Sequence, residues 1–431
     1  MTIDTMSRIP EETIASVLDS TDIVELIGSY VTLKKVGQSY QGLCPFHTEK
    51  TPSFSVSPEK HIFRCFGCGA SGNAISFVRK HQKISFPEAV RWLAQRAGIA
   101  LETEQDKKRE ELLFCLSRAQ EEFRAQLKSG AYSVPENYLK KRGVTPKTQE
   151  DFGIGYAGSV QSLIASLKKW GIKKKAIPLQ IGLLKEKEKG LTCPFMSRIT
   201  LPIFDPRGNV IGFGGRAADN SQQVKYINSS DSSVFSKRRC LFGLNRVVPI
   251  DGTILLVEGY FDVLSLHQAG FKNALGLLGT VLSPEQVRIL ERLAHGVTLI
   301  FDGDKGGKAA LIRSLKAPLH GLGARAVLLP ERDPDEFVRN RGAKDLETLI
   351  DKAPGIKEAA VEIVSQRVKS ERIEDLIEET AQIGSEIPDS VEASLFAEQA
   401  ATALDIPGWV LQEKTQEKRE KKGKIYERKK A

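Results

Sequence analysis

Long apolar runs are absent from this 431-residue chain. No stretch approaches the roughly 18 apolar residues of a membrane-spanning helix, and the start MTIDTMSRIPEET lacks the regions of a secretion signal. Cysteine is scarce too, at six residues, and Cys115, Cys193 and Cys240 have no partner in the sequence pattern. We therefore predict a cytoplasmic protein in a reducing compartment, without a disulfide framework.

A strong charge is likewise missing from most of the chain. The net charge is +9, but the tail from Glu413 to Lys430 carries nine Lys/Arg against four Glu, a balance of +5. The mildly basic body favours a polyanionic partner without identifying it. Because the tail has almost no apolar residues, we expect it to be disordered and to attract phosphates or an acidic partner; a solubilising tail without a role is the alternative.

Four potential metal ligands lie in two pairs near the N-terminus. Cys44 and His47 stand at i and i+3, Cys65 and Cys68 do the same, and seventeen residues separate the pairs. A tight turn can aim both side chains of a pair at one point, and two turns complete the tetrahedral shell of Zn²⁺. Because four ligands leave no open position, we expect one structural zinc ion.

The segment between these pairs alternates around Phe54 and Val56, turns near Ser57–Lys60 and returns, as a β-hairpin does. A redox CxxC motif beside an unrelated CxxH motif is the alternative. His61 could in principle replace His47, although it lies four residues before Cys65 on the return strand. The pattern as a whole predicts a zinc ribbon.

Regular strand–helix alternation begins at Thr253. TILLV, NALGLL, VTLIF and ARAVLL indicate strands, and one of the helical patterns between them starts with a capping box at Ser283 and Gln286. Alternation of this kind predicts a parallel sheet with helices on its faces. The charged run at 103–111 indicates a linker or an exposed helix start.

We therefore expect a multidomain protein of mixed α+β and α/β class. The expected parts are a zinc-ribbon domain at 1–102, a mixed domain at 112–245, a parallel-sheet domain at 246–340, a helical region at 341–412 and a basic tail at 413–431.

Carboxylates follow three of the predicted parallel strands. They are Glu258 after TILLV, Asp302 and Asp304 after VTLIF, and Asp333 and Asp335 after ARAVLL. Ligands of open parallel sheets gather at the carboxyl ends of the strands, and Mg²⁺ prefers oxygen ligands. For any single acid, a helix N-cap or loop position is the alternative. The set together predicts a magnesium site.

Two glycine-rich segments are less informative. GFGGR at 212–216 lacks the full GxGxxG pattern and its helix, so it does not predict a dinucleotide fold. DGDKGGKAA has the wrong spacing for a P-loop, and no Ser or Thr follows Lys308.

Several segments resemble one family in the order in which that family carries them. EGYFDV, FDGD and DPDEFV resemble the Toprim domain shared by topoisomerases and primases. Three further segments resemble other parts of bacterial DnaG-type primases: the stretch from LPIFDPRGNVIGFGG to LFGL, the ribbon string from CPFH to AISFV, and YLKKRGVTPKTQEDFGIGYA. Together the resemblance covers about residues 8–350. The resemblance implies a DNA primase, a DNA-directed RNA polymerase that makes short RNA primers on single-stranded DNA for replication by two-metal nucleotidyl transfer.

The same resemblance implies roles for individual residues. The zinc ligands would be Cys44, His47, Cys65 and Cys68. The catalytic acids would be Glu258, Asp302 and Asp304, which hold magnesium, with Asp333 and Asp335 as further candidate ligands. Basic residues of the template and nucleotide groove fall on Arg142, Arg198, Arg216, Lys225 and Lys237.

The implied cofactors are one structural Zn²⁺ and two or more catalytic Mg²⁺, with Mn²⁺ as an alternative. The implied partners of a monomeric enzyme at the nucleoid are single-stranded DNA, ribonucleoside triphosphates and the replicative helicase. In the ribbon, Phe63 and Phe66 with Lys60 and Arg64 could stack unpaired bases, whereas Phe54 fits the ribbon core better.

The chain departs from the family pattern in places. The usual NSPET reads Asn228-Ser229-Ser230-Asp231-Ser232, and the usual Lys-Gly reads Lys237-Arg238. The part after the Toprim pattern is shorter than the family's helicase-docking domain, which predicts a reduced primase or one recruited through another surface. The rival interpretations are another Toprim enzyme, such as a topoisomerase or nuclease, and a catalytically silent single-strand binder.

Overall fold

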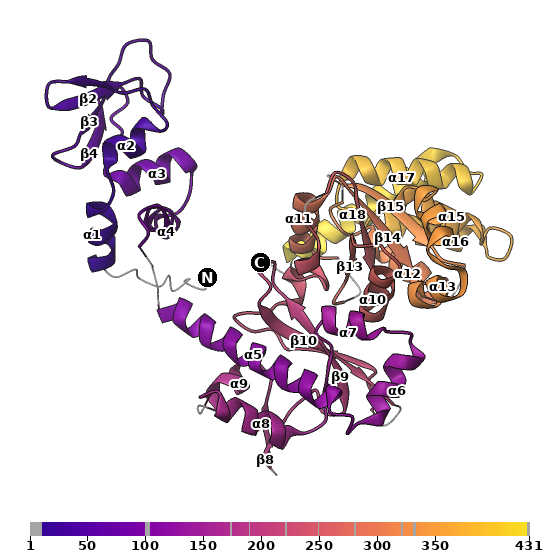
Figure 1. Cartoon of the computed structure of the whole chain (residues 1–431). Helices are drawn as coiled ribbons and strands as arrows, with labels where there is room; N and C mark the ends of the chain where they lie inside the picture. Colours follow the sequence, from indigo (N-terminus) through magenta and orange to yellow (C-terminus); the bar gives the residue numbers. More distant parts are fainter. Residues whose placement is uncertain are drawn as a thin grey trace. The chain divides into compact units, whose positions relative to one another are not determined.

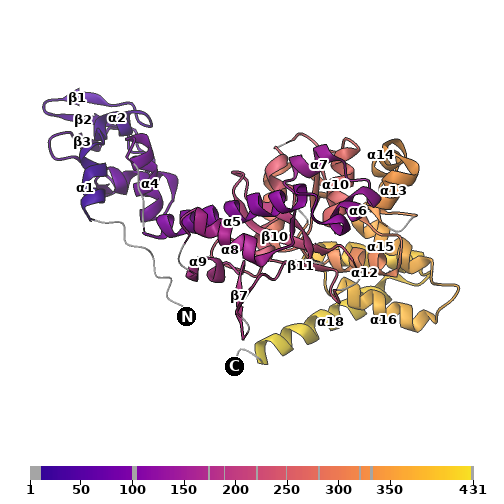
Figure 2. The same ribbon diagram turned by 60° about the horizontal axis from the view of Figure 1, so that its bottom comes forward.

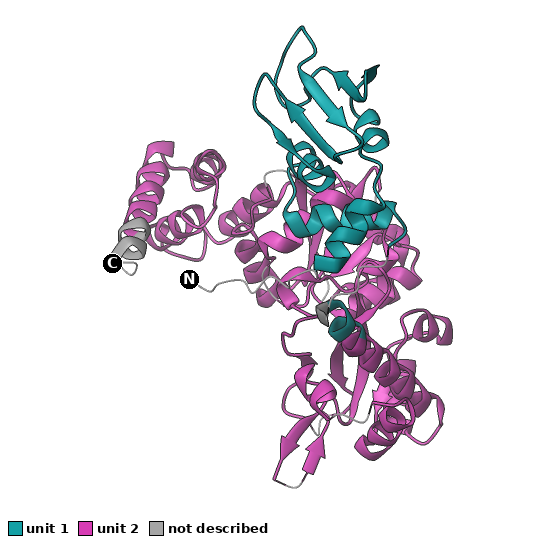
Figure 3. Ribbon diagram, turned by 90° about the vertical axis from the view of Figure 1, so that its left-hand side faces the viewer, with its two compact units in different colours: residues 1–110 teal, residues 111–431 magenta. Residues whose placement is uncertain are grey.

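The computed structural model describes residues 11–99, 104–172, 175–188, 190–219, 222–248, 250–279, 282–319, 322–330 and 333–428. The chain divides into two compact units, Met1–Glu110 and Glu111–Ala431, which Figure 3 colours separately. Their boundary falls inside helix α5 (Glu104–Lys128), so residues 104–111 of the charged run form the start of a helix, and residues 107–111 of it are exposed. Residues 1–10 and 100–102 of the expected ribbon domain, and 429–431 of the expected tail, lie outside the described residues.

The first unit is built around an antiparallel sheet with strand order β1-β2-β3-β4-β5. Phe54, Phe63 and Phe77 are fully buried beside it, and each buried ring contributes roughly 2–3 kcal/mol to folding. The predicted hairpin is confirmed, because Phe54 pairs with Cys65 and Ser57 with Ile62. The elements are α1 (Glu11–Asp19), α2 (Ile23–Gly28), β1 (Lys34–Val36), β2 (Ser39–Gly42), β3 (Phe54–Ser57), β4 (Ile62–Cys65), β5 (Ser71–Gly72), α3 (Ala74–Gln82) and α4 (Phe86–Arg96).

The first sheet of the second unit is antiparallel, with the strand order β11-β10-β9-β6, and β7 and β8 form a separate hairpin. The GFGGR segment lies in β10, so it is no dinucleotide loop. A Cβ on Gly214 would lie 2.3 Å from the ring of Tyr260, so the glycine makes room for that ring. The elements are α6 (Ser133–Lys141), α7 (Pro146–Asp151), β6 (Gly155–Ala157), α8 (Val160–Lys169), α9 (Ala176–Gln180), β7 (Lys185–Lys187), β8 (Gly190–Thr192), β9 (Arg198–Phe204), β10 (Val210–Ala217) and β11 (Tyr226–Asn228).

The predicted parallel sheet is confirmed, with the strand order β13-β12-β14-β15 and parallel pairing throughout (Figure 1). The capping box at Ser283 and Gln286 is also present, since each side chain accepts the other residue's amide. The elements are β12 (Thr253–Val257), α10 (Tyr260–Gln268), β13 (Ala274–Gly276), α11 (Pro284–Leu293), β14 (Gly296–Phe301), α12 (Lys305–Ser314) and β15 (Gly323–Leu328).

The chain after the sheet is helical, as predicted, but the prediction of a disordered tail is wrong. Helix α18 (Gly408–Arg428) includes most of it, and Thr415 is buried. Lys414 and Lys418 each lie 2.7 Å from Glu378 on α16. Helix α18 packs beside α16, as Figure 2 shows. The other helices are α13 (Pro334–Arg341), α14 (Ala343–Asp351), α15 (Ile356–Ser365), α16 (Ile373–Gly384) and α17 (Ser390–Ala403).

No helix in the described ranges has the length and apolar character needed to span a membrane. All six cysteines are free thiols.

Candidate metal centres and nucleic-acid interface

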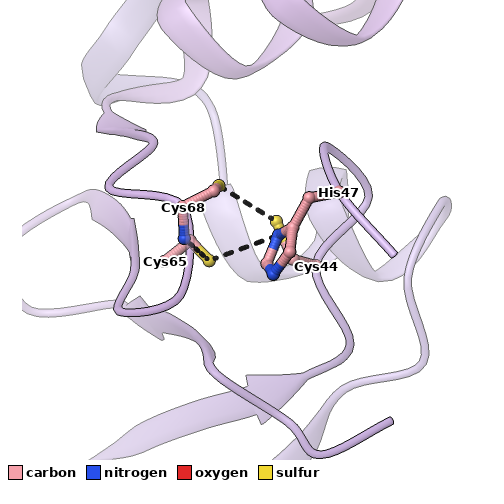
Figure 4. A group of neighbouring side chains, drawn as sticks. All are labelled: Cys44, His47, Cys65 and Cys68. Atoms are coloured by element: carbon pink, nitrogen blue, oxygen red, sulfur yellow. Dashed lines mark hydrogen bonds between the residues drawn. The ribbon is translucent and has the colours of Figure 1, made fainter. Parts of the chain in front are cut away.

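The predicted ribbon ligands converge on one point (Figure 4). The ligand atoms of Cys44, His47, Cys65 and Cys68 all lie within 4.8 Å of one another. The Cys44 and Cys68 sulfurs are 3.8 Å apart, and the Cys65 sulfur is 3.8 Å from His47 Nδ1. A tetrahedral zinc site with Zn–S bonds of about 2.3 Å has sulfur–sulfur edges of about 3.8 Å. The four side chains therefore fit one Zn²⁺.

Glu49, which the sequence analysis did not single out, orients this site. Its carboxylate lies 3.2 Å from His47 Nε2 and accepts the Cys44 amide at 2.7 Å. With Nε2–H donating to Glu49, the Nδ1 lone pair of His47 is free to bind metal. An acid two residues after the histidine was the available signal. His61 lies in the hairpin turn with a φ of 51° and is not in the ligand group.

The strand-end acids meet at a reversal in the topology of the parallel sheet. From β12 the chain passes through α10 to β13 on one side, and from β14 it passes through α12 to β15 on the other. Ligands of open α/β sheets bind at such a reversal. Glu258 follows β12 directly, and Asp302 follows β14, so both lie at this point.

Helix starts hold two more of these acids. Asp304 caps α12 by accepting the Gly307 amide at 3.0 Å, and Asp333 caps α13 by accepting the Glu336 amide at 2.7 Å. A Cβ on Gly307 would lie 1.9 Å from the Asp302 carbonyl oxygen, so only glycine lets the chain turn this tightly. The N-cap alternative thus holds for both acids, but it leaves carboxylate oxygens available to a ligand.

The electrostatics of this edge fit a cation. Burial, together with the carboxylates of Glu258 and Asp333, raises the pKa of Asp302 to about 7. Burial also raises the pKa of Glu258, whose Oε1 atom is buried and accepts no hydrogen bond from the described part of the chain. Hard divalent cations favour such an oxygen set and would reverse the rise in pKa. Among the described residues, the Cys/His set is the one group of three or more candidate metal ligands, and its ligand atoms all lie within 4.8 Å of one another.

Asp262 is a further acid of this edge that the sequence analysis missed. It is 8% exposed on α10 and accepts the Gly259 amide at 3.0 Å. Burial, and then the charges of Asp333 and Asp302, raise its pKa to about 8. The available signal was one acid in the otherwise apolar helix start YFDVL.

Asp335 has arginine partners instead of a free coordination sphere. It is 2% exposed and lies 2.6 Å from Arg142 and 3.1 Å from Arg339. Arg142 lies 4.0 Å from Asp333 as well. The candidate metal ligand Asp335 and the candidate groove residue Arg142 thus bind each other.

An open pocket of about 950 Å³ contains one of these acids, Asp333, in its lining. Its lining includes Arg142, Arg216, Tyr138 and Asp333. Tyr138, another residue that the sequence analysis missed, accepts the Nε–H of Arg216 at 3.0 Å. The Arg216 guanidinium also lies 4.9 Å from the ring centre of Tyr226, so stacking holds it in the pocket wall.

The other three basic candidates lie outside this pocket. Arg198 is 4% exposed and donates to the Lys225 carbonyl at 3.2 Å and to Gln222 at 3.0 Å. Burial, with the charge of Arg216, lowers the pKa of Arg198. Lys225 and Lys237 are exposed. Arg198 thus orders the loop that carries Lys225, while the two lysines are accessible to a ligand.

Family comparisons agree with this arrangement. Residues 9–109 match the CHC2 zinc finger family, 122–248 match the N-terminal domain of the DNA primase catalytic core, and 255–338 match the Toprim-like family.

Individual relatives agree as well. The chain is 38% identical to the DNA primase of Clostridium acetobutylicum over 403 residues, which cover 90% of this chain and 67% of that protein. It is 37% identical to the DNA primase of Aquifex aeolicus over 395 residues, 90% of this chain and 78% of that one.

Solved structures of primases are similar too. The crystal structure of the zinc-binding and RNA polymerase domains of Aquifex aeolicus primase matches with a TM-score of 0.59 and 36% identity, over 93% of this chain and 98% of that one. A DnaG primase catalytic domain bound to single-stranded DNA matches with a TM-score of 0.57 and 26% identity, over 70% of this chain and 98% of that one. With its zinc ribbon, its acid-edged parallel sheet and these relatives, the chain belongs to the DnaG-type DNA primases, enzymes that synthesise RNA primers.

Proposed function

We propose that this primase extends short RNA primers at the carboxyl ends of the central strands β12 and β14 by two-metal nucleotidyl transfer. The observation that carries the proposal is the buried, unpartnered Oε1 of Glu258 beside Asp302, whose pKa is raised to about 7. Carboxylates are costly to hold together without a counter-charge. This edge is therefore built for divalent cations.

Glu258, Asp302, Asp304 and Asp333 would hold the ions. Mg²⁺, with Mn²⁺ as an alternative, would activate the attacking 3′-hydroxyl and neutralise charge on the leaving pyrophosphate. Asp304 and Asp333 keep their orientation through the amides that they accept at the starts of α12 and α13. Asp335 could reach a cation only by leaving Arg142 and Arg339, so we assign it to positioning Arg142.

The pocket that Asp333 lines suits a ribonucleoside triphosphate. The Arg216 guanidinium lies over the rings of Tyr138 and Tyr226, and its Nη1 donates to the Ala217 carbonyl at 3.0 Å, so the group is rigidly supported. Guanidinium groups bind phosphate oxygens in pairs. Lys225 and Lys237, both exposed, would hold template phosphates without reading sequence.

For the zinc ribbon, we propose template contact through one aromatic side chain. Phe54 and Phe63 are fully buried, whereas Phe66 is 71% exposed. The Arg64 guanidinium lies 5.3 Å from the Phe66 ring centre. Stacking on an exposed ring beside a cation is how unpaired bases are held without sequence readout. The replicative helicase is a further expected partner.

The direct test is primer synthesis. The protein is incubated with single-stranded DNA, Mg²⁺ and labelled ribonucleotides, and short RNA is the expected product. Omitting Mg²⁺ or the template should abolish the product. DNA binding without any RNA product under these conditions would instead support the catalytically silent binder.

A further inference from the structure

A second pocket of the larger unit surrounds an arginine for which the described residues provide no hydrogen-bond acceptor. It has a volume of about 610 Å³, and its lining includes Lys147, Asp151, Phe152, Arg246 and Lys272. Its walls come from α7, the last turn of α10 and the 3-10 segment Leu244–Arg246. Helices α7 and α10 lie side by side in both Figure 1 and Figure 2.

Arg246 is the unusual member of this lining. Its guanidinium carbon lies 4.3 Å from the ring centre of Phe152, and its Nε atom is buried without a hydrogen-bond partner. Within the described ranges, no carboxylate or carbonyl oxygen accepts from its side chain. Burial lowers the pKa of Arg246 more than the charge of Asp151 raises it, as expected for a cation held partly out of water. Buried donors of this kind normally have a partner.

The other charged side chains of the lining also leave an excess of positive charge. Lys272 is held in the wall because its ammonium donates to the His267 carbonyl at 2.6 Å. Asp151, the carboxylate of the lining, lies 3.1 Å from Lys147. His267 adds no charge, since its Nε2–H donates to the Ala274 carbonyl at 2.9 Å and burial lowers its pKa. Arg246 and Lys272 thus leave the pocket with excess positive charge.

This pocket is separate from the acid edge of the sheet. Glu258 and Gly259 precede the amino end of α10, whereas His267 and Gln268 of the pocket form its carboxyl end. The nine residues of α10 span about 13 Å at 1.5 Å per residue. A ligand of this pocket would therefore not be the nucleotide undergoing reaction.

We propose that this pocket binds a phosphate group, with Arg246 as its main donor and Lys272 as the second cation. A planar guanidinium on an aromatic ring presents paired donors to phosphate oxygens. The volume falls within the range of small-ligand sites, roughly 300–1,000 Å³, so it admits a polyphosphate or nucleotide. The same chemistry would also suit a phosphate of the DNA backbone.

The test uses two probes on the full chain, in buffer without divalent cations. Inorganic pyrophosphate is titrated calorimetrically, and a short single-stranded oligonucleotide is titrated by fluorescence anisotropy. Arg246→Gln and Lys272→Gln should each weaken binding of at least one probe fivefold or more. Arg292→Gln, at an exposed site on α11, is the matched control and should leave both affinities unchanged. Hydrogen–deuterium exchange of peptides covering 145–152 should slow with the bound probe in wild type and not in Arg246→Gln.

The two probes separate the sources of the phosphate. Weaker pyrophosphate binding in both variants identifies a free polyphosphate ligand, and weaker oligonucleotide binding alone identifies a backbone phosphate. If both affinities stay within twofold of wild type in both variants, the pocket is no phosphate site. Lys272→Gln keeps the test decisive should Arg246→Gln unfold, and neither probe depends on primer synthesis.

Discussion

The Arg142 guanidinium lies 2.6 Å from the carboxylate of Asp335, a residue 193 positions away in the sequence. Arg142 ends α6, and Asp335 lies in the first turn of α13. Asp335 is buried, and the side chain of Arg142 is 27% exposed. The pair therefore ties the part of the core that precedes the parallel sheet to the helix that follows it.

Removing one member of this pair should cost stability more than metal affinity. Asp335→Asn removes the buried carboxylate that Arg142 and Arg339 share and leaves Arg142 only Asp333, at 4.0 Å. It should lower the free energy of unfolding by about 3 kcal/mol, as for other buried pairs. Urea unfolding measures this loss, and Asp345→Asn, at an exposed site on α14, is the control. Unchanged stability with lost Mg²⁺ binding would make Asp335 a metal ligand instead.

The ribbon should lose its metal when one ligand is removed. His47→Ala removes a ligand and should release stoichiometric zinc and unfold the first unit, because a four-ligand shell holds such small domains folded. His61→Ala, in the hairpin turn, should keep its zinc. Elemental analysis and circular dichroism measure both effects. Zinc retained in His47→Ala but lost in His61→Ala would reverse the ligand assignment.

Primer synthesis should depend on the charge of Asp302. Asp302→Asn preserves the shape of the side chain but removes the charge that a cation needs, so the rate should fall at least a hundredfold, equivalent to about 2.7 kcal/mol in the barrier. Single-stranded DNA binding should persist. Asp251→Asn, whose side chain is fully exposed, should synthesise primers normally. A near-normal rate for Asp302→Asn would show that Asp302 is not a ligand of the catalytic metal.

Stability without divalent cations should fall as the pH rises. The pKa of Asp262 is about 8 in the fold and about 3.9 in unfolded chains. Between these values the folded state keeps a proton that the unfolded state has lost, so its stability declines by at most about 1.4 kcal/mol per pH unit.

Asp262→Asn should remove that part of the decline, because asparagine can still accept the Gly259 amide but never ionises. Urea midpoints at pH 6, 7 and 8, compared between wild type and variant, measure the difference. Parallel pH profiles for the two proteins would show that Asp262 does not titrate in this window.

Template affinity should depend on salt through the exposed groove lysines. Lys225→Ala should reduce the slope of log affinity against log salt by about one unit, because one phosphate contact is lost. Lys369→Ala, at an exposed site after α15, is the control and should leave the slope unchanged. Arg198→Ala should instead destabilise the loop at Lys225, since Arg198 is buried. Equal slopes for Lys225→Ala and wild type would show that Lys225 makes no contact with a template phosphate.

Much of the architecture could be predicted from local patterns. The zinc ligands, the hairpin between them, the capping box at Ser283 and the parallel strands were all predicted, because spacing, turn chemistry and strand–helix alternation are local properties. The tail was mispredicted because composition does not show a partner: Glu378 lies 2.7 Å from Lys414 and Lys418 and holds them on α16.

The amino-acid sequence by itself thus determined the family, the ribbon and the strand ends that carry the acids. Only the tertiary structure decided which side chains remain free for a ligand. Arg142 and Asp335 satisfy each other, Arg198 is buried against its own loop, and Arg246 finds no acceptor among the described residues. These outcomes depend on contacts between residues that are distant in sequence, and burial in those contacts sets the charge balance of each site.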